Sequence, residues 1–350
     1  MEHIGIDLGG RESQICIRSP DGEIVLEIRC RTADLGEFLA RRGKSRVILE
    51  TCAEAFAVAD QALALGHEVR VVPAMLVRSL GIGSRGVKND RKDARVLSEV
   101  SCRIDLPSVH IPDPTSREAK SLSGTRECLI GARTKIVNNV RGWMRTELVQ
   151  VRSGGTETFP KRVRKVLLER EAGMPSFIES ALSGIEALTM QIVKLDEDLS
   201  RIAQANEICR RLMTAPIGPV TAVRYVAALD RIDRFASAHA VESYLGLTPR
   251  EDFSCKRGQR GSITKAGSAA VRRALVQCCW SMWRLRPNDP LVLWAKAIAE
   301  RRGKRTAIIA MARKLAGILY AMWRDATPYN PFHQKKQLEI PPVAPTTAAP

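Results

Sequence analysis

The first hundred residues alternate between short apolar strand patterns and helical patterns, and this order limits the possible folds more than any other feature of the chain. Three strand-like segments come first, at residues 3–8 (HIGIDL), 14–19 (QICIRS) and 23–31 (EIVLEIRCR). Asp21 and Gly22 separate the second segment from the third and suit the turn of a β-hairpin. The chain is therefore predicted to begin with an antiparallel meander.

Strands and helices alternate after this meander. A predicted helix at 34–42 is followed by a strand at 46–51 (RVILET), a helix at 53–65, a strand at 68–73 (EVRVVP) and a helix that opens near Asp90. A meander that leads into such alternation predicts a mixed sheet flanked by helices. The order of elements matches a ribonuclease-H-like fold.

The rest of the chain has helical patterns. Residues 115–151 and the segment from Lys161 onward are separated by a Gly/Ser-containing break at 152–160 (RSGGTETFP). Five apolar residues then follow a coiled-coil spacing over about two heptads: Leu188, Ile192, Leu195, Leu199 and Ile202. We interpret this part as a helical arm that packs on itself or on a second subunit.

The predicted fold class is thus α/β plus all-α, and the 350 residues are enough for two or three domains. We expect a ribonuclease-H-like mixed-sheet domain at 1–112 and a helical, coiled-coil arm at 113–212. A mostly helical C-terminal domain is expected at 213–328, and a disordered tail at 329–350.

An excess of positive charge bounds the class of partner. The chain has 55 Lys and Arg against 38 Asp and Glu, a formal net charge of +17. Residues 250–324 alone hold 17 Lys and Arg against 4 Asp and Glu, so that +13 of charge falls in this stretch. Such concentration favours a nucleic acid over a membrane surface. No apolar run approaches the roughly 18–20 residues that span a bilayer.

The nine cysteines are scattered and include no C-x-x-C pair. The first residues lead directly into a predicted strand, so we expect no signal peptide. These observations favour free thiols in a reducing cytoplasm, without a disulfide framework or a structural zinc site.

Four acidic residues are candidates for a metal site. Asp7 is out of phase with the isoleucines of its strand, and Glu50 ends a strand at the sheet edge where ligand sites collect. Asp90 and Asp93, three residues apart, share one face of the helix that they open. Four converging carboxylates repel one another unless divalent cations neutralise them, and two magnesium ions would also suit phosphodiester chemistry. The simpler alternative is that Asp90 and Asp93 only cap their helix.

A basic loop follows at 249–268 (PREDFSCKRGQRGSITKAGS), and a helix is expected to begin near Ser268. Backbone amides of a Gly-rich loop, together with a helix N-terminus, form a natural phosphate cradle. Ser254 becomes a nucleophile only where another group takes its proton and the phosphorane is stabilised. On chemistry alone a loop that contacts the nucleic-acid backbone is the simpler interpretation, and the other hydroxyls compete with Ser254: Ser262, Thr264 and Ser268.

Further residues are candidates for phosphate contacts. Residues 216–222 (PIGPVTA) are similar to a helix-hairpin-helix, whose Gly turn, here Gly218, presents amides to phosphate; Pro216 stands where that pattern has another Gly. A packing role is the alternative for this turn. The basic candidates are Lys88, Arg91, Lys92, Lys256, Arg257, Arg260 and Lys265.

Residues 5–10 (GIDLGG) also resemble the first phosphate-binding segment of sugar kinases and related ATPases, which share the ribonuclease-H-like core. A Thr or Ser usually follows the glycines there, whereas this chain has Arg11 and Glu12. No second Gly-rich nucleotide turn lies downstream, and this disfavours a kinase.

Taken in order, several segments resemble the DEDD transposases of bacterial insertion sequences, the IS one-ten / IS eleven-eleven family. The segments in the first domain are GIDLGG, ILETCAEA at 48–55 and VKNDRKDARVL at 87–97. Those in the C-terminal part are APIGPVTA, YLGLTPRED, GSITKAGSAAVRRAL and AIIAMARKLAGILYAMWR. The resemblance covers most of the chain, and KNDRKDA and ITKAG…RRAL are its most specific parts.

The resemblance implies a RuvC-like domain with Asp7, Glu50, Asp90 and Asp93 as a magnesium-binding tetrad and Ser254 as the nucleophile. It implies cutting and rejoining of DNA through a serine–phosphate link, an element-encoded guide RNA, and a homo-oligomer (dimer or tetramer) in which one subunit's acids meet another's serine. Cys255-Lys256 stand where many members have Gly after the serine. Two alternatives remain: a metal-dependent, structure-selective nuclease without a covalent step, and a decayed transposase that only binds nucleic acid.

Overall fold

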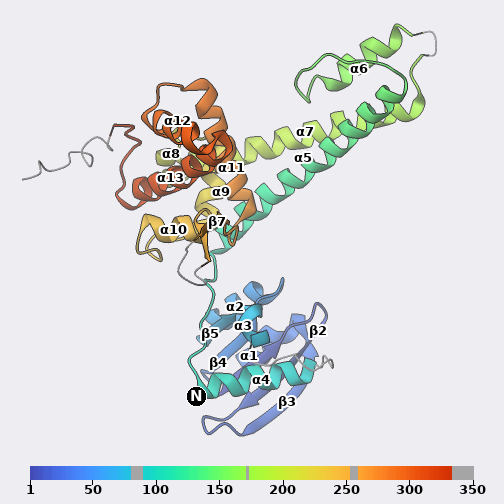
Figure 1. Ribbon diagram of the computed structural model, residues 1–350. Coiled ribbons are helices and arrows are strands. Elements are labelled where there is room, and N and C mark those ends of the chain that lie inside the picture. The colour runs from blue at the N-terminus through green and yellow to red at the C-terminus, as the bar shows by residue number, and fades with distance from the viewer. Residues whose placement is uncertain (80–89, 171–172, 253–258, 333–350) are drawn as a thin grey trace, which may run out of the picture. The chain divides into compact units, whose positions relative to one another are not determined.

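The computed structural model describes residues 1–79, 90–170, 173–252 and 259–332. The chain divides into two compact units, Met1–Asp113 and Pro114–Pro350, and each is described by itself. The first unit is a sheet covered by helices, and the second is almost wholly helical (Figure 1).

The sheet of the first unit has five strands in the order β3-β2-β1-β4-β5. β1 pairs antiparallel with β2, and β2 with β3, whereas β1 with β4 and β4 with β5 are parallel. This confirms the predicted mixed sheet with an antiparallel meander. The strands are β1 (His3–Asp7), β2 (Glu12–Arg18), β3 (Ile24–Arg31), β4 (Arg46–Glu50) and β5 (Glu68–Val72).

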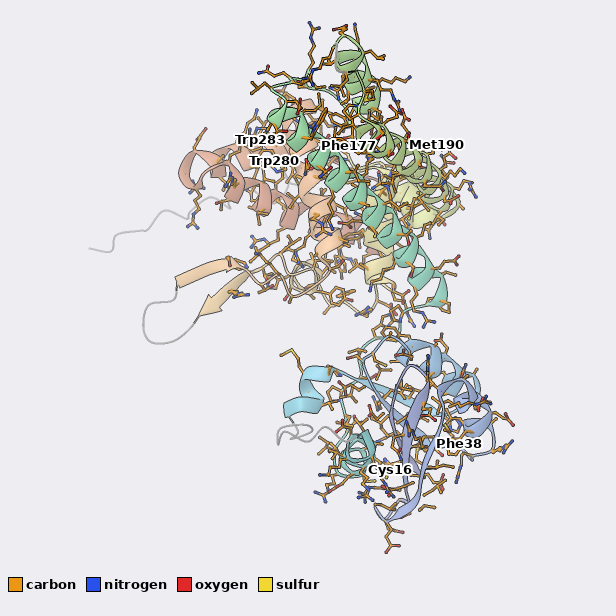
Figure 2. All side chains as sticks on the ribbon, turned by 90° about the vertical axis from the view of Figure 1, so that its right-hand side faces the viewer. Cys16, Phe38, Phe177, Met190, Trp280 and Trp283 are labelled. Carbon is orange, nitrogen blue, oxygen red and sulfur yellow. The ribbon has the colours of Figure 1, made fainter. Side chains whose placement is uncertain are left out.

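The sheet is buried on both faces, because its central strands carry apolar side chains in both phases. On one face Ile4 and Ile6 pack with α1 (Leu35–Ala40) and α2 (Ala55–Ala64), and on the other Ile48 packs with Leu97 of α4 (Asp90–Arg103). Cys16 and Phe38 lie on opposite sides of the sheet (Figure 2). Two short helices, η1 (Thr32–Asp34) and α3 (Ala74–Ser79), were not predicted.

In the second unit, α5 and α7 form an antiparallel helical hairpin (Figure 1). Arg126 pairs with Asp196, and Arg133 donates a hydrogen bond to Thr189, so partners approach in reverse order along the two helices. The predicted arm therefore packs on itself. Its helices are α5 (Pro114–Thr146), α6 (Phe159–Leu168) and α7 (Ser176–Ala205).

The predicted coiled-coil seam is only partly buried. Ile192 and Leu199 are buried, but Ile202 is 36% exposed and Ala203 takes the buried position in its place. A straight helix repeats every 3.6 residues, so a 3.5-residue apolar pattern drifts around it and leaves the contact surface within a few turns.

The helices that follow the arm share one core around α13. Among the described residues α13 is the one helix long and apolar enough to span a membrane by length and composition, yet 56% of its most apolar window is buried within this unit. Tyr225 Oη donates a hydrogen bond to the Ala316 carbonyl. These elements are α8 (Glu207–Leu212), α9 (Pro219–Leu229), α10 (Ala238–Tyr244), β6 (Pro249–Asp252), β7 (Gln259–Ile263), α11 (Ala269–Leu285), α12 (Pro290–Arg302) and α13 (Lys304–Arg324).

Two sequence-based expectations differ from the structure in this unit. The segment predicted as a loop contains the antiparallel pair β6–β7, and α12 was not predicted. The predicted arm and C-terminal domain both fall within Pro114–Pro350, and their finer division stays a prediction. Of the predicted tail, residues 333–350 lie outside the described residues.

Candidate active site

Asp7 and Glu50 stand at the carboxyl ends of neighbouring parallel strands. β1 and β4 are in register up to Ile6 opposite Leu49, so the two acids follow at the same level. Because side chains alternate along a strand, Asp7 shares the sheet face of Gly5, and Glu50 shares that of Ile48. Gly5 and Ile48 are themselves paired in the register, so both acids lie on one face and one edge.

The helix that carries the other two acids lies on this same face. A Cβ built on Gly5 would stand 2.4 Å from the Ala94 carbonyl oxygen and 2.6 Å from the Ser98 nitrogen, so α4 packs backbone-close against β1. At the far end of the strand, His3 Nδ1 and Ser101 Oγ form a 2.8 Å hydrogen bond. α4 thus runs antiparallel to β1, and its first turn lies at the Asp7 end.

The two flanks of α4 face different strands. Arg91 and Arg95, four residues apart, pair with Glu27 of β3. Asp93 is four residues before Leu97, which packs with Ile48 of β4, so Asp93 lies on the β4 flank. The backbone of Asp90 opens α4, but its side chain lies outside the described residues.

The structure therefore brings Asp7, Glu50 and Asp93 to one edge and one face of the sheet. Carboxylate oxygens are the ligands that magnesium prefers, so the predicted donor set fits this ion by its chemistry. Within the described residues, no three His, Cys, Asp or Glu side chains lie close enough to share a metal ion. The side chain of Asp90, the fourth predicted ligand, lies outside the described residues.

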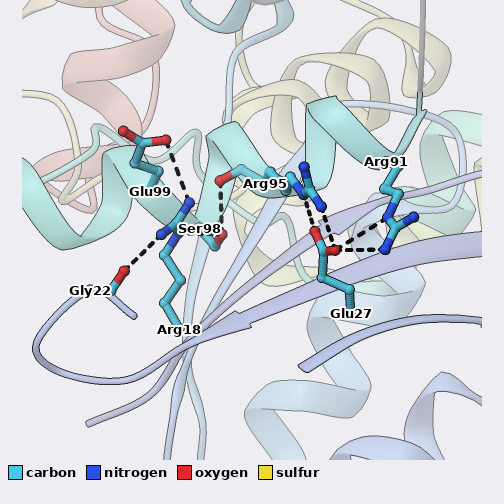
Figure 3. A network of polar contacts seen from close by, with 7 residues as sticks. All are labelled: Arg18, Gly22, Glu27, Arg91, Arg95, Ser98 and Glu99. Atoms are coloured by element: carbon cyan, nitrogen blue, oxygen red, sulfur yellow. Dashed lines mark hydrogen bonds and ion pairs between the residues drawn. The ribbon is translucent and has the colours of Figure 1, made fainter. Parts of the chain in front are cut away.

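Glu27 is the centre of a charged network that the sequence analysis did not identify (Figure 3). Arg91 donates to its carboxylate through Nη2 at 2.8 Å and Nε at 3.2 Å, and Arg95 through Nη2 at 2.6 Å and also through Nε. The hydrogen bonds from Arg95 and Arg91 hold the pKa of Glu27 at about 2. Arg91, predicted as a phosphate contact, is engaged within the protein.

Glu54 is a second acid that the sequence analysis missed. Its Oε1 lies 3.7 Å from the position of a Cβ on Gly10, in the turn that follows β1.

The sequence did contain a signal for Glu27. An acid inside the apolar segment EIVLEIRCR requires a partner on the covered face.

The predicted serine loop is carried by the β6–β7 hairpin. Ser254, Lys256 and Arg257 lie outside the described residues, as does Lys88, and Arg260 is described only by its backbone in β7. Lys92 and Lys265 are exposed. Ser268 caps α11 by accepting a hydrogen bond from the Val271 amide, so this rival hydroxyl has a structural role.

Two glycines fix the base of this hairpin. A Cβ on Gly267 would stand 1.9 Å from the Tyr244 carbonyl oxygen, and Gly246, with φ +68°, abuts the backbone of Lys265 and Ala266. The Lys265 amide also donates to the Gly246 carbonyl at 3.1 Å. The segments YLGLTPRED and GSITKAGS are therefore packed backbone against backbone.

Gly218 caps α9 and is exposed, with nothing near the position of a Cβ. Burial raises the pKa of the Cys278 thiol, and hydrogen bonds from the Thr221 side chain and the Gly218 backbone act in the opposite direction. The turn predicted to present its amides to phosphate therefore also contacts a half-buried thiol.

Comparison with known proteins identifies the family of this chain. Residues 4–147 match the family model for the DEDD transposase of the IS110 type, and residues 209–291 match the one described as transposase IS116/IS110/IS902 family. The two ranges together cover more than half of the chain. This chain belongs to the IS110 transposase family.

Relatives of this transposase align over almost their whole length. The transposase for insertion sequence element IS1111A of Coxiella burnetii is 26% identical over 326 residues, which cover 91% of this chain and 88% of the relative. The transposase for IS1328 of Yersinia enterocolitica is 27% identical, with 93% and 98% covered. A probable family 20 transposase of Pseudomonas aeruginosa is 24% identical, with 95% and 99% covered. The protein is thus a transposase enzyme, and its five-stranded mixed sheet fits a ribonuclease-H-like DEDD domain.

Proposed function

We propose that this transposase cuts and rejoins DNA at a magnesium site formed by Asp7, Glu50, Asp90 and Asp93. The observation that supports it best is the convergence of Asp7, Glu50 and the first turn of α4 on one edge and one face of the sheet. Two ions at such a site supply charge neutralisation for the carboxylates and Lewis-acid stabilisation of the phosphoryl oxygens. The rigid strand ends would hold the carboxylates, and α4 would complete the set.

Ser254 is the proposed nucleophile. It lies between β6 and β7 of a hairpin whose base is fixed by Gly246 and Gly267. In the proposed step, the Ser254 Oγ–P bond forms as the scissile P–O bond breaks. The hydroxyl proton passes to a carboxylate and then to the departing sugar oxygen. The acids and the serine belong to different units, and we propose that they meet in the active enzyme. They meet either within one chain or between two chains of a homo-oligomer.

Trapping of a covalent intermediate tests the serine step. End-labelled DNA that carries an element end, incubated with the wild type and magnesium, should yield a protein–DNA adduct resistant to denaturant. Ser254→Ala should yield none, whereas Ser262→Ala, at an exposed position in β7, should keep the adduct. Cleavage by the wild type without any adduct would identify a nuclease that lacks a covalent step. Binding without cleavage would identify a decayed transposase.

We propose that the nucleic-acid surface lies on the second unit. It includes the predicted cations of the serine loop and the helices α11 to α13. Trp280 and Trp283 lie on α11 (Figure 2), with Lys304 Nζ 5.3 and 5.2 Å from their ring centroids. The surrounding cations are exposed: Arg284, Arg301, Arg302, Lys304 and Arg305. Positive charge beside aromatic rings suits the backbone and bases of nucleic acid.

We propose that one occupant of this surface is an element-encoded guide RNA, and that the protein works in the cytoplasm. The eight cysteines in the described part of the chain are free, which suits a reducing compartment. Purification without nuclease, followed by sequencing of the retained RNA, tests the first proposal. Enrichment of a transcript from the flanks of the gene supports it, and retention of only bulk cellular RNA contradicts it.

A further inference from the structure

Glu27 occupies an unusual place for a carboxylate. β3 is an edge strand, yet the Glu27 side chain is only 10% exposed. The strand registers place it in one row across the sheet, paired with Cys16, which pairs with Gly5, which pairs with Ile48. Glu27 therefore stands on the sheet face that α4 covers, at the level where α4 approaches β1 most closely.

The contact of α4 with Gly5 does not by itself define the rotation of the helix about its axis. Gly5 offers no side chain, and α4 meets it with the Ala94 carbonyl oxygen, the Ser98 nitrogen and the Leu97 Cβ. Leu97 packs with Ile48 and fixes the flank of α4 that faces β4, so the opposite flank needs a contact of its own. Contacts on its flanks must set that roll.

Helix geometry couples the two flanks. Successive residues are about 100° apart around an α-helix, so Arg91 and Arg95 each lie about 160° from Asp93 by the shorter way round. When Glu27 holds both arginines toward β3, Asp93 must face β4, the strand that ends in Glu50. Asp90 lies about 60° from Asp93 and turns with it.

The other polar anchors of α4 lie nearer its C-terminus. Arg18 donates to Ser98 Oγ at 3.3 Å and to the Gly22 carbonyl at 2.7 Å, and pairs with Glu99 (Figure 3). His3 bonds to Ser101. Among these anchors in the described part of the unit, the Glu27 network is the one closest to the acids.

We propose that Glu27 is a positioning residue of the transposase site, which sets the roll of α4 through Arg91 and Arg95 and thereby directs Asp90 and Asp93 toward Asp7 and Glu50. This inference rests on the proposed metal site. It assigns Arg91 to the support of that site, in place of its predicted contact with phosphate.

Metal binding by the full chain without DNA tests this role. Manganese titrated by calorimetry should bind Glu27→Gln roughly 10–100-fold more weakly than the wild type, as for other residues that orient metal ligands. Cleavage should need correspondingly more magnesium for half-saturation, with much of the rate recovered at saturating magnesium. Hydrogen exchange of α4 should stay slow in the variant, which shows that the helix has not melted.

Two controls separate this role from general charge effects. Glu37→Gln removes an exposed acid that pairs with Arg41 on α1, and should leave metal affinity unchanged. Arg95→Gln should weaken metal binding as Glu27→Gln does. The double variant should bind metal scarcely more weakly than either single variant, because each of the three proteins lacks the same ion pair between Glu27 and Arg95.

The outcomes are distinguishable. If Glu27→Gln binds manganese as the wild type does while Asp7→Asn does not, the positioning role is wrong and the metal site stands. If Glu27→Gln weakens binding but the double variant shows additive losses, Glu27 does not act through Arg95, and the inference is overturned. If the wild type binds no divalent metal, both the proposed function and this inference are wrong.

Discussion

Gly5 determines how closely the acidic helix can approach the sheet. Its missing Cβ allows the backbone of α4 to lie directly on β1, which places the first turn of the helix beside Asp7. A glycine inside a strand usually weakens it, unless another backbone needs the space. Here the space left by the missing Cβ of Gly5 is occupied by the backbone of α4, which carries Asp90 and Asp93 of the proposed site.

Replacing this glycine should therefore loosen the unit. Gly5→Ala would place a Cβ 2.4 Å from the Ala94 carbonyl oxygen and should destabilise β1 and α4 by about 1–3 kcal/mol, the usual cost of overpacking. Gly43→Ala is the control, since nothing lies within 4 Å of a Cβ there. Hydrogen exchange of β1 and α4 peptides measures both; equal protection in the two variants would show that the close approach is not needed.

The Glu27 network should also be visible in the pH dependence of stability. Its pKa is about 2 in the folded protein against an ordinary value of 4.5, so its contribution is present above about pH 4.5 and is lost as the pH falls toward 2. The difference in the free energy of unfolding between wild type and Glu27→Gln should shrink over that range. A difference that stays constant from pH 7 to pH 3 would mean that the carboxylate is not paired.

At the level of elements, the sequence predicts strands and helices well where a period is long and uninterrupted. The five strands of the mixed sheet follow from short apolar segments bounded by turns, and α13 follows from helical spacing. The hairpin β6–β7 was missed because its strands are rich in polar and glycine residues, so that no apolar alternation marks them. Asp7 and Glu50 could be placed on one edge from strand phase, whereas Glu27 could not be paired with α4 before the packing of the helix was known.

The arm shows what the heptad pattern can and cannot predict. Leu199 is fully buried, whereas Ile202, the next member of the predicted seam, is 36% exposed. Leu199→Ala should cost about 2–5 kcal/mol of unfolding free energy, and Ile202→Ala, at a partly exposed position, only about 1 kcal/mol. Hydrogen exchange of α7 measures both losses. Equal losses would mean that Ile202 is covered in solution, for example by a second subunit along the arm.

At the scale of the whole molecule, the net charge of +17 makes polyanion binding the dominant electrostatic property. Affinity for DNA should fall by roughly 10³–10⁵-fold between 50 and 200 mM salt if 6–10 phosphates are neutralised. Fluorescence anisotropy of a labelled duplex at several salt concentrations gives the slope. A slope near zero would exclude the C-terminal cations as the main contact surface.

The central claim is that Asp7, Glu50, Asp90 and Asp93 share divalent metal ions. Anomalous diffraction from crystals of the full-length transposase soaked in manganese measures this most directly. The account predicts anomalous peaks at the carboxyl edge of β1 and β4, each within about 2.0–2.3 Å of oxygens from these acids. Manganese bound elsewhere, with the four carboxylates too far apart to share any ion, would contradict it.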